Sequence, residues 1–241
     1  MTRPLRILPV ALIVAVALTF MVPPSQPWAK PPSPPTPFAA TQIRFEKNAS
    51  GNDLGIQVFL DGEPWRRVEI FGPDGRRIFE VEGRGSLRGL GLTELFFESN
   101  EPSLDEVPLE DLLALFPAGT YTFVGKTVDG ARLTGTARLT HDIPDGPVIV
   151  APTAGAVVDR NNAVISWRAV TTPAGIEIAG YQVIVLGGEP SREFNVRVLA
   201  TTTSVTVSRE FLEPGTAYTF EVLAIEASGN QTITEGSFRT P

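Results

Sequence analysis

The sequence predicts an all-β protein built from two tandem β-sandwiches, and three observations support this prediction. The 22 prolines and 22 glycines fall mostly at turns and in one linker, while long stretches of helical periodicity are nearly absent. Short alternating runs of apolar and polar residues recur between the turns. The 241 residues exceed one typical domain of about 100 to 150 residues, and a hydrophobic fraction of 42% is enough to fill two cores. Because the chain has no cysteine, its stability must come from packing and hydrogen bonds.

The N-terminal segment carries the pattern of a secretory signal. Arg3 and Arg6 precede an apolar run over residues 7–22, which is shorter than the roughly 20 residues that span a bilayer comfortably. We therefore predict a signal peptide over residues 1–29. An uncleaved anchor is the alternative, because no clear small-x-small cleavage pattern follows the run. The Pro-rich residues 30–40 are predicted to form an extended linker.

The first folded region is predicted over residues 41–144. Asp61 to Pro64 and Gly72 to Gly75 have strong turn sequences, and Asp129-Gly130 predicts a hairpin with a type I′ turn. Between these turns we expect strands at residues 42–45, 55–60, 65–71, 76–81, 92–97, 121–128 and 132–140.

One short helix is predicted in this region. Ser103 and Glu106 have the spacing of a capping box, and Pro108 offers an alternative start as the first helical residue. Pro117 and Gly119 would end the helix. The side chains expected to pack on the sheet are Leu112, Leu113, Leu115 and Phe116. The glycine-rich stretch at residues 83–91 lacks the Lys-Ser/Thr ending of a phosphate-binding loop and is predicted as a flexible loop or bulged strand.

The second folded region is predicted over residues 145–241. Strands are expected at residues 147–152, 163–167, 178–185, 192–199, 204–207, 218–224 and 236–240. The segment from Leu212 to Tyr218, LEPGTAY, resembles the turn-to-strand corner of a fibronectin type III domain. The predicted strand at residues 163–167, which ends in Trp167, resembles the second strand of that family. The resemblance implies an immunoglobulin-like sandwich over 145–241. It also implies that Trp167 and Tyr218 are buried, with the Tyr218 hydroxyl bonded to backbone near the corner.

No family is recognised for residues 41–144. The segment from Phe116 to Phe123, FPAGTYTF, looks like the start of a strand in immunoglobulin-like and transthyretin-like sandwiches, but it covers only a few residues. These folds serve many functions, so the resemblance implies no activity.

The net charge of −7 argues against a nucleic-acid partner. Removal of residues 1–29 would take Arg3 and Arg6 from the 20 basic residues, leaving 18 against 27 acidic ones and a net charge of −9. Binding to phosphates needs a basic surface. The pairs Arg66-Arg67 and Arg76-Arg77 are interpreted as solvated strand ends.

The densest group of acids lies in residues 94–111. A calcium site is one interpretation, but the alternating ligands and sharp-turn glycine of a calcium loop are missing. The others are a solvated face with acids near a helix N-terminus, or a surface that docks on a basic partner. The acids are Glu94, Glu98, Glu101, Asp105, Glu106, Glu110 and Asp111.

The residue types of known catalytic sites are sparse. The single histidine, His141, stands beside Asp142 without a nucleophile-elbow sequence, and one histidine without cysteine cannot complete a usual zinc site. A carboxylate pair could in principle cleave a glycosidic bond, but the sequence indicates no long substrate cleft. We therefore predict no enzyme activity, no cofactor, and no catalytic, cofactor-binding or metal-binding residue.

The predicted function is that of a non-catalytic exported module for binding or scaffolding, secreted or in the periplasm or cell envelope. The expected partner is a protein or a cell-surface polymer, and a membrane only if the N-terminal segment stays uncleaved. The alternative is a carbohydrate-binding accessory module of polysaccharide-processing machinery. Because Trp28 precedes the folded regions and Trp167 is assigned to a core, Trp65 is the candidate tryptophan for stacking on a sugar.

Overall fold

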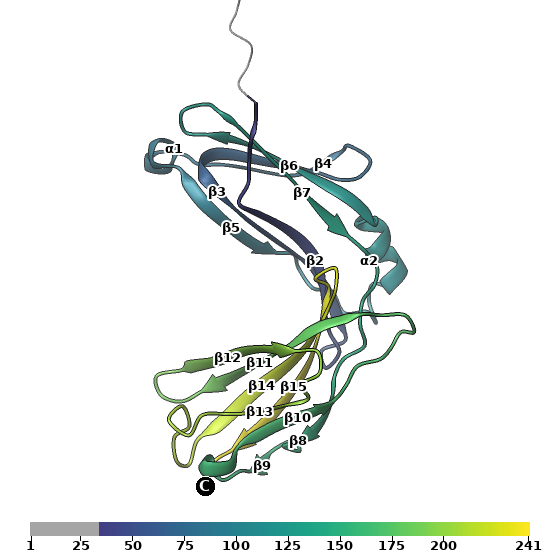
Figure 1. The fold of residues 1–241 in the computed structure, drawn as a ribbon, viewed down its shortest axis with the longest axis vertical. Coiled ribbons are helices and arrows are strands. Elements are labelled where there is room, and N and C mark those ends of the chain that lie inside the picture. The colour runs from purple at the N-terminus through teal and green to yellow at the C-terminus, as the bar shows by residue number, and fades with distance from the viewer. Residues whose placement is uncertain (1–33) are drawn as a thin grey trace, which may run out of the picture. The chain divides into compact units, whose positions relative to one another are not determined.

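A computed structural model of the protein describes residues 34–241, which form one compact unit with two hydrophobic cores (Figure 1). The predicted signal peptide, 1–29, and the first residues of the predicted linker, 30–33, lie outside the described residues. Within 34–241, none of the helices has the length and apolar character needed to cross a membrane.

The predicted all-β class is confirmed. The first sandwich contains β1 (Thr36–Pro37), β2 (Ala40–Asn48), β3 (Asp53–Phe71), β4 (Arg77–Glu82), α1 (Ser86–Leu90), β5 (Leu92–Glu98), α2 (Leu109–Leu115), β6 (Gly119–Thr127) and β7 (Arg132–Leu139). The second contains β8 (Val148–Ala151), β9 (Ala156–Val157), a 3₁₀ turn η1 (Arg160–Asn162), β10 (Val164–Arg168), β11 (Ile178–Gly187), β12 (Arg192–Leu199), β13 (Ser204–Thr206), β14 (Ala217–Glu226) and β15 (Gln231–Arg239).

The 19-residue strand β3 runs through both layers of the first sandwich, whose strands form one continuous, bent sheet. Its first half pairs with β2 and β5, and its second half pairs with β4 and β6. The turn predicted at Asp61 to Pro64 is therefore wrong, because the strand continues through these residues with a shift of register between Asp61 and Trp65. A local irregularity of this kind bends a strand and lets it pass from one packed sheet to the other. Trp65, at the bend, has 0% of its surface exposed.

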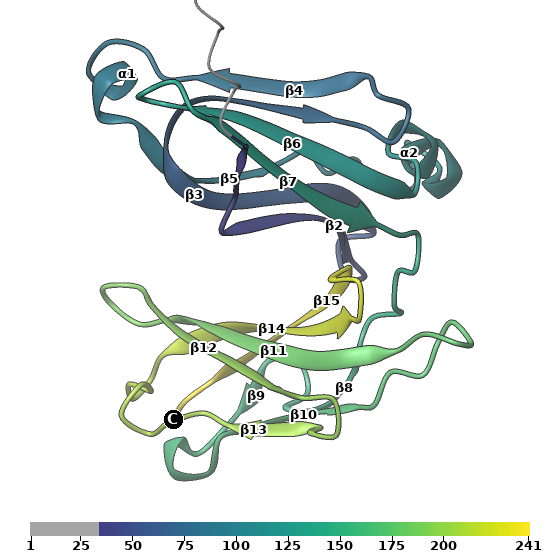
Figure 2. The same ribbon diagram turned by 45° about the horizontal axis from the view of Figure 1, so that its top comes forward.

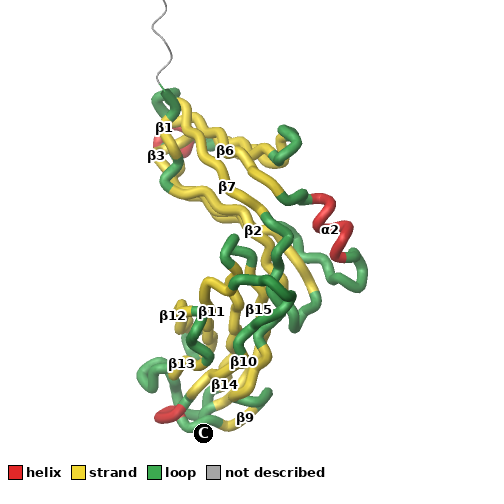
Figure 3. Tube along the Cα trace, turned by 45° about the vertical axis from the view of Figure 1, so that its right-hand side comes forward, coloured by secondary structure: helices red, strands yellow, loops and turns green. Residues whose placement is uncertain are grey.

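Three further details of the first sandwich differ from the sequence predictions. The glycine-rich stretch contains the short helix α1 rather than only a loop or bulge. In α2, Leu112 is buried, but Leu115 points away from the core with 68% of its surface exposed. Figure 3 shows α2 as a short helix between longer loop and strand segments. Pro108 is its N-cap, and Ser103 lies in a preceding turn where its hydroxyl accepts a bond from the amide of Asp105.

The hairpin between β6 and β7 is confirmed, but its turn is not type I′. That turn needs positive φ at both central residues, whereas here Gly130 has a φ of 97° and Asp129 is not among the residues with positive φ. The Gly130 amide donates to the Thr127 carbonyl, so the turn begins one residue earlier than predicted and ends with glycine in the left-handed region.

The predicted linker over 30–40 also ends earlier than expected. Thr36–Pro37 form β1, which pairs in parallel with Leu133 and Thr134 of β7. Phe38 is buried in the first core. Burial of the apolar Phe38 ring lowers the free energy more than solvation of an extended segment would. Residues from Thr36 onward therefore belong to the sandwich.

The second sandwich stacks a three-stranded sheet on a larger one. The order β13-β10-β8 forms one layer, and β12, β11, β14 and β15 are neighbours in the other (Figure 2). Trp167 and Tyr218 are buried between the layers, as predicted, and Trp167 lies 5.3 Å from the ring of Tyr181. Each large ring buries about 150 to 250 Å² and so contributes strongly to the core.

Each sandwich has a tyrosine that fixes the start of a strand after a Pro-Gly corner. The amide of Glu213 donates to the Tyr218 hydroxyl at 2.7 Å, which confirms the bond implied by the family resemblance. In the first sandwich the Tyr121 hydroxyl donates to the carbonyl of Pro117 at 3.1 Å. Both phenol groups thus satisfy a backbone group that the turn leaves free.

The two cores are joined by backbone pairing and by buried polar side chains, of which Asn230 makes the most contacts with backbone groups of the first region. Residues Gln231–Ile233 of β15 pair in parallel with Glu46–Asn48 of β2. Asn230, 1% exposed, accepts the amide of Phe45 at 2.8 Å, and its Nδ2 donates to the carbonyls of Thr140 and Asp142 at 3.1 Å each. One amide group therefore links β2, the segment after β7 and the β14–β15 turn.

We expect Tyr218→Phe to lower the free energy of unfolding by about 1–2 kcal/mol, because the Glu213 amide loses its partner in a partly buried place. Urea titration followed by tryptophan fluorescence measures this change. Tyr121→Phe is the matched variant, and its effect should be smaller because the Pro117 carbonyl can be reached by water. An unchanged midpoint for Tyr218→Phe would contradict the role given to the corner bond.

We expect Asn230→Ala to lower the free energy of unfolding by about 2–3 kcal/mol, because the buried amide of Phe45 is left without an acceptor. Hydrogen exchange gives a residue-specific readout, in which the Phe45 amide should exchange faster. Asn100→Ala, at an exposed position, is the control and should leave both measurements unchanged. Native protection of the Phe45 amide in Asn230→Ala would show that the bond is dispensable.

Candidate functional site

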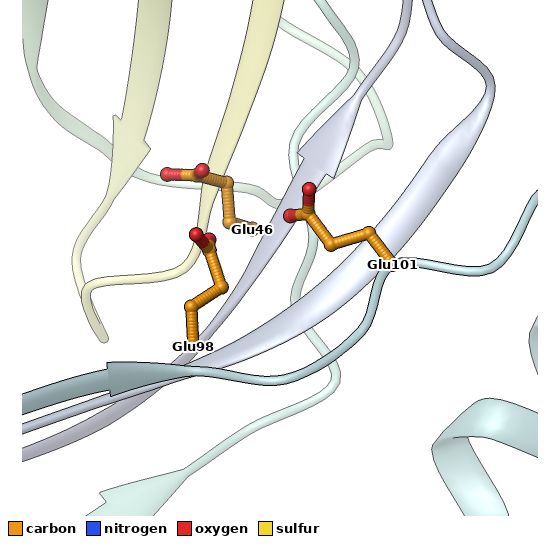
Figure 4. A group of neighbouring side chains, drawn as sticks. All are labelled: Glu46, Glu98 and Glu101. Carbon is orange, nitrogen blue, oxygen red and sulfur yellow. The ribbon is translucent and has the colours of Figure 1, made fainter.

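Three glutamates meet beside the junction of the two cores. Glu46 of β2, Glu98 at the end of β5 and Glu101 in the loop that follows bring carboxylate oxygens within 4.8 Å of one another, and Figure 4 shows the three side chains converging. Glu46 is half-buried, while Glu98 and Glu101 are exposed. The antiparallel register of β2, β3 and β5 creates this meeting, because Glu46 lies opposite Gly55 and Glu98 lies opposite Gln57.

The predicted acidic run does not act as one cluster. Glu94 pairs across the sheet with Asp61, Asp105 accepts a bond from Asn52, and Glu110 with Asp111 occupies the first turn of α2. Two acids of the run, Glu98 and Glu101, join Glu46. A bare trio of carboxylates provides fewer oxygens than the six to eight that calcium prefers, so these side chains alone do not complete a calcium site.

Hydrogen bonds already occupy part of the glutamate trio. Gln231 donates to Glu46, and Gln57 donates to Glu98 at 2.7 Å. Burial raises the pKa of Glu101 to about 7, with the charge of Glu98 as the next cause, and burial also raises the pKa of Glu46. The trio therefore relieves its repulsion by holding a proton near neutral pH.

His141 has a structural position. Its Nε2 lies 2.9 Å from the carbonyl oxygen of Phe116, and its ring packs edge-on against Phe45 at 5.9 Å. Within residues 34–241 no serine or threonine hydroxyl is hydrogen-bonded to this ring. The geometry required for a nucleophile activated by histidine is therefore not formed in that part of the chain.

Trp65 is not a platform for sugars. Its side chain is completely buried in the first core, so the stacking role considered from the sequence is wrong, and its alternative role as a core residue is confirmed. The bend of β3 turns the indole inward, where it contributes to packing.

A groove of about 570 Å³ lies next to the glutamate trio. Arginines from three strands line it: Arg44 of β2, Arg138 of β7 and Arg197 of β12. The other lining residues are Thr41, Gln42, Ile43, Thr136, Ala137, Ala179, Ile225, Glu226, Ala227, Ser228, Gly229 and Gln231. Its volume is within the range of about 300–1,000 Å³ found for ligand sites.

The second sandwich matches a known family. The fibronectin type III domain model matches residues 151–239. Its three-stranded and four-stranded layers and its tyrosine corner have the arrangement that the resemblance implied. Residues 151–239 form a fibronectin type III domain.

Sequence relatives of the chain are parts of much longer proteins. Endoglucanase B of Cellulomonas fimi is 33% identical over 132 residues, which cover 52% of this chain and 12% of that protein. A titin homolog of Caenorhabditis elegans is 28% identical over 116 residues, which cover 48% of this chain and 1% of that protein. The chain thus matches only a small share of each relative.

Solved structures of type III domains also match. The FN1–FN3 domains of chicken CNTN1 align over 86% of this chain and 69% of that chain, with 16% identity and a TM-score of 0.34. A two-domain type III segment of chicken tenascin aligns over 84% of this chain and 98% of that chain, with 14% identity and a TM-score of 0.30.

The sequence predictions missed Glu46 and the three groove arginines. Along β2, Ile43 and Phe45 are buried while Gln42, Arg44 and Glu46 lie on the opposite face, an alternation visible in the sequence. That signal could have marked a polar face. It could not have shown that Arg197 of the type III domain lines the same groove.

We expect Glu101→Gln to stabilise the protein at pH 8 and to have little effect at pH 4. Folding raises the pKa of this carboxyl, so the protonated group is better tolerated in the folded protein than the charged one. Its contribution to stability is complete at pH values below its pKa in the unfolded chain, and it is lost as pH rises through about 7. Because Glu101 is exposed and screened by solvent, the gain at pH 8 should be only about 0.5–1 kcal/mol. Urea titrations at the two pH values measure it. Glu94→Gln, in the strand before this loop, is the control, and an equal effect of Glu101→Gln at both pH values would contradict the assignment.

Proposed function

We propose that the protein is an exported, non-catalytic module that binds a protein or a cell-surface polymer, or holds one in place, outside the cell or at the cell envelope. The observation that carries the proposal is the burial of Trp65, Trp167 and the three tyrosines, together with the structural use of His141. Tryptophan and tyrosine often form stacking platforms and histidine often acts as a general base, but in residues 34–241 these side chains are used for packing or structural hydrogen bonds. Binding is then left to polar surfaces such as the groove.

The type III domain supports a modular role. Such a domain is a scaffold on which sites are placed, and its presence alone does not supply a reaction. The proposed export rests on the charged and apolar pattern of residues 1–29. The relatives support a modular role too, because the matched stretch is 12% of one and 1% of the other.

A carbohydrate-binding accessory module is the second candidate function. The match to a protein named endoglucanase B favours it, since polysaccharide is the natural partner of such machinery. Burial of Trp65 argues against stacking on neutral sugar rings through that residue, so a glycan would have to be held by polar contacts.

The proposal predicts binding without turnover. The purified full chain should release no reducing ends from soluble neutral or acidic polysaccharides over many hours, and it should be retained by at least one polymer or envelope protein fraction. Fractionation of the producing cells should place it outside the cytoplasm. Sustained hydrolysis that is lost in Glu98→Gln or Glu101→Gln would overturn the non-catalytic assignment, and a cytoplasmic location would overturn the export.

A further inference from the structure

The three arginines of the groove carry positive charge that no acidic side chain of the described residues pairs. Arg44, Arg138 and Arg197 form no ion pair with any acidic group of residues 34–241, although seven ion-pair contacts occur elsewhere in that range. Burying or crowding cations without a partner is unfavourable. A groove with three unpaired guanidinium groups is therefore suited to an anion.

Two of these guanidinium groups are held by amides instead of carboxylates. Arg44 donates through Nε to Gln57 at 2.8 Å, and Arg197 donates through Nε to Gln182 at 3.1 Å. Both glutamines are at least nine-tenths buried. An amide oxygen orients a guanidinium without neutralising it, so the arginine keeps its full charge and most of its five donors.

Each supporting amide is fixed in turn by a second polar group. Gln57 donates to Glu98 at 2.7 Å, and Gln182 donates to Asn195 at 2.9 Å. The orientation of the arginines is thus set before any ligand arrives. Preorganised donors lose less conformational entropy on binding than free surface side chains do.

The charges around Arg44 are mixed. Burial lowers the pKa of Arg44, the charge of Glu46 opposes this shift, Arg197 adds to it, and Glu98 opposes it. Glu226 also lines the groove and accepts a bond from the Ser228 amide at 2.8 Å, which does not neutralise its carboxylate. Three arginines against this one glutamate still give the lining an excess of cationic side chains, within a chain whose net charge is −7.

The lining also limits the kind of anion. Among residues 34–241, no aromatic side chain lines the groove. Proteins that bind neutral sugars or single-stranded nucleic acids, in contrast, commonly stack the rings of these ligands on aromatic groups. Arginine forks bind carboxylates and related oxyanions by two parallel hydrogen bonds. Three forks on three strands suit a chain that presents several such anions in sequence.

We propose that the groove between β2, β7 and β12 binds an acidic polysaccharide, with Arg44, Arg138 and Arg197 contacting successive charged groups. This inference rests on the proposed binding function and specifies the class of polymer. The charged groups are carboxylates or sulfates, and two polymers in the test distinguish them.

The test measures binding of the purified full chain by calorimetry and affinity electrophoresis at low and moderate salt. Polygalacturonate supplies carboxylates, dextran sulfate supplies sulfates, and uncharged dextran is the neutral counterpart of the latter. We expect binding to at least one acidic polymer, none to dextran, and weaker binding as salt rises. Arg138→Gln and Arg197→Gln should each weaken affinity about tenfold, the range for a lost charge-assisted contact.

Matched variants separate the groove from general charge. Arg88→Gln in α1 and Arg168→Gln in β10 remove the same charge at exposed sites outside the lining, and should leave affinity unchanged. Arg197→Lys keeps the charge but loses the fork, and should fall between native and Arg197→Gln. Arg138 and Arg197 are exposed, so these variants should keep the native unfolding midpoint.

Several results would overturn the inference. One is native affinity for the acidic polymer in the Arg138→Gln/Arg197→Gln double variant, and another is an equal loss of affinity in the two control variants. Equal binding of dextran and dextran sulfate, or tighter binding of single-stranded DNA than of the acidic polymer, would also overturn it. If the chain binds none of the acidic polymers but binds a protein or neutral glycan through other residues, the groove proposal fails while the binding function stands. Hydrolysis of a polymer would instead defeat the proposed function.

Discussion

The carboxamide of Asn230 is the interaction on which the rest of the arrangement depends. Its oxygen accepts the Phe45 amide and its nitrogen donates to two carbonyls after β7, so one buried group satisfies three backbone segments. The short parallel pairing of β15 with β2 begins at the next residue. This pairing spans only three residues, and its first residue, Gln231, donates to Glu46. The groove and the glutamate trio both adjoin this point.

The use of aromatic side chains explains what kind of recognition the molecule offers. Trp65, Trp167 and Tyr218 are all consumed by packing, and the tyrosine hydroxyls complete backbone turns. The groove presents guanidinium, amide and hydroxyl groups, one carboxylate and several aliphatic side chains, but no aromatic ring of residues 34–241. Such a surface discriminates by charge and by hydrogen-bond geometry rather than by apolar area, so its selectivity should depend on ionic strength.

Much of the fold followed from local sequence signals, because strands alternate with period two and corners carry proline and glycine. The hydroxyl bond at the Tyr218 corner was implied by the resemblance to the type III family, and the structure confirms it. The failures have a common cause. At Asp61 the local sequence favours a turn, but pairing with both β2 and β5 keeps the chain extended. Glu46 and Glu98 meet only through that same long-range pairing, and Arg197 reaches the groove from the other sandwich, so no local signal could have assembled them.

The double membership of β3 affects how the protein can be engineered. Its residues 61–64 have the composition of an exposed loop, which is where a tag or a reporter domain would ordinarily be inserted. In this protein an insertion there would cut the one strand shared by both layers and would displace the buried indole beside it. The tip of the β6–β7 hairpin at Gly130 is the safer place, since its strands are paired on either side and its turn residues are solvated. A fusion at that tip would keep both layers continuous.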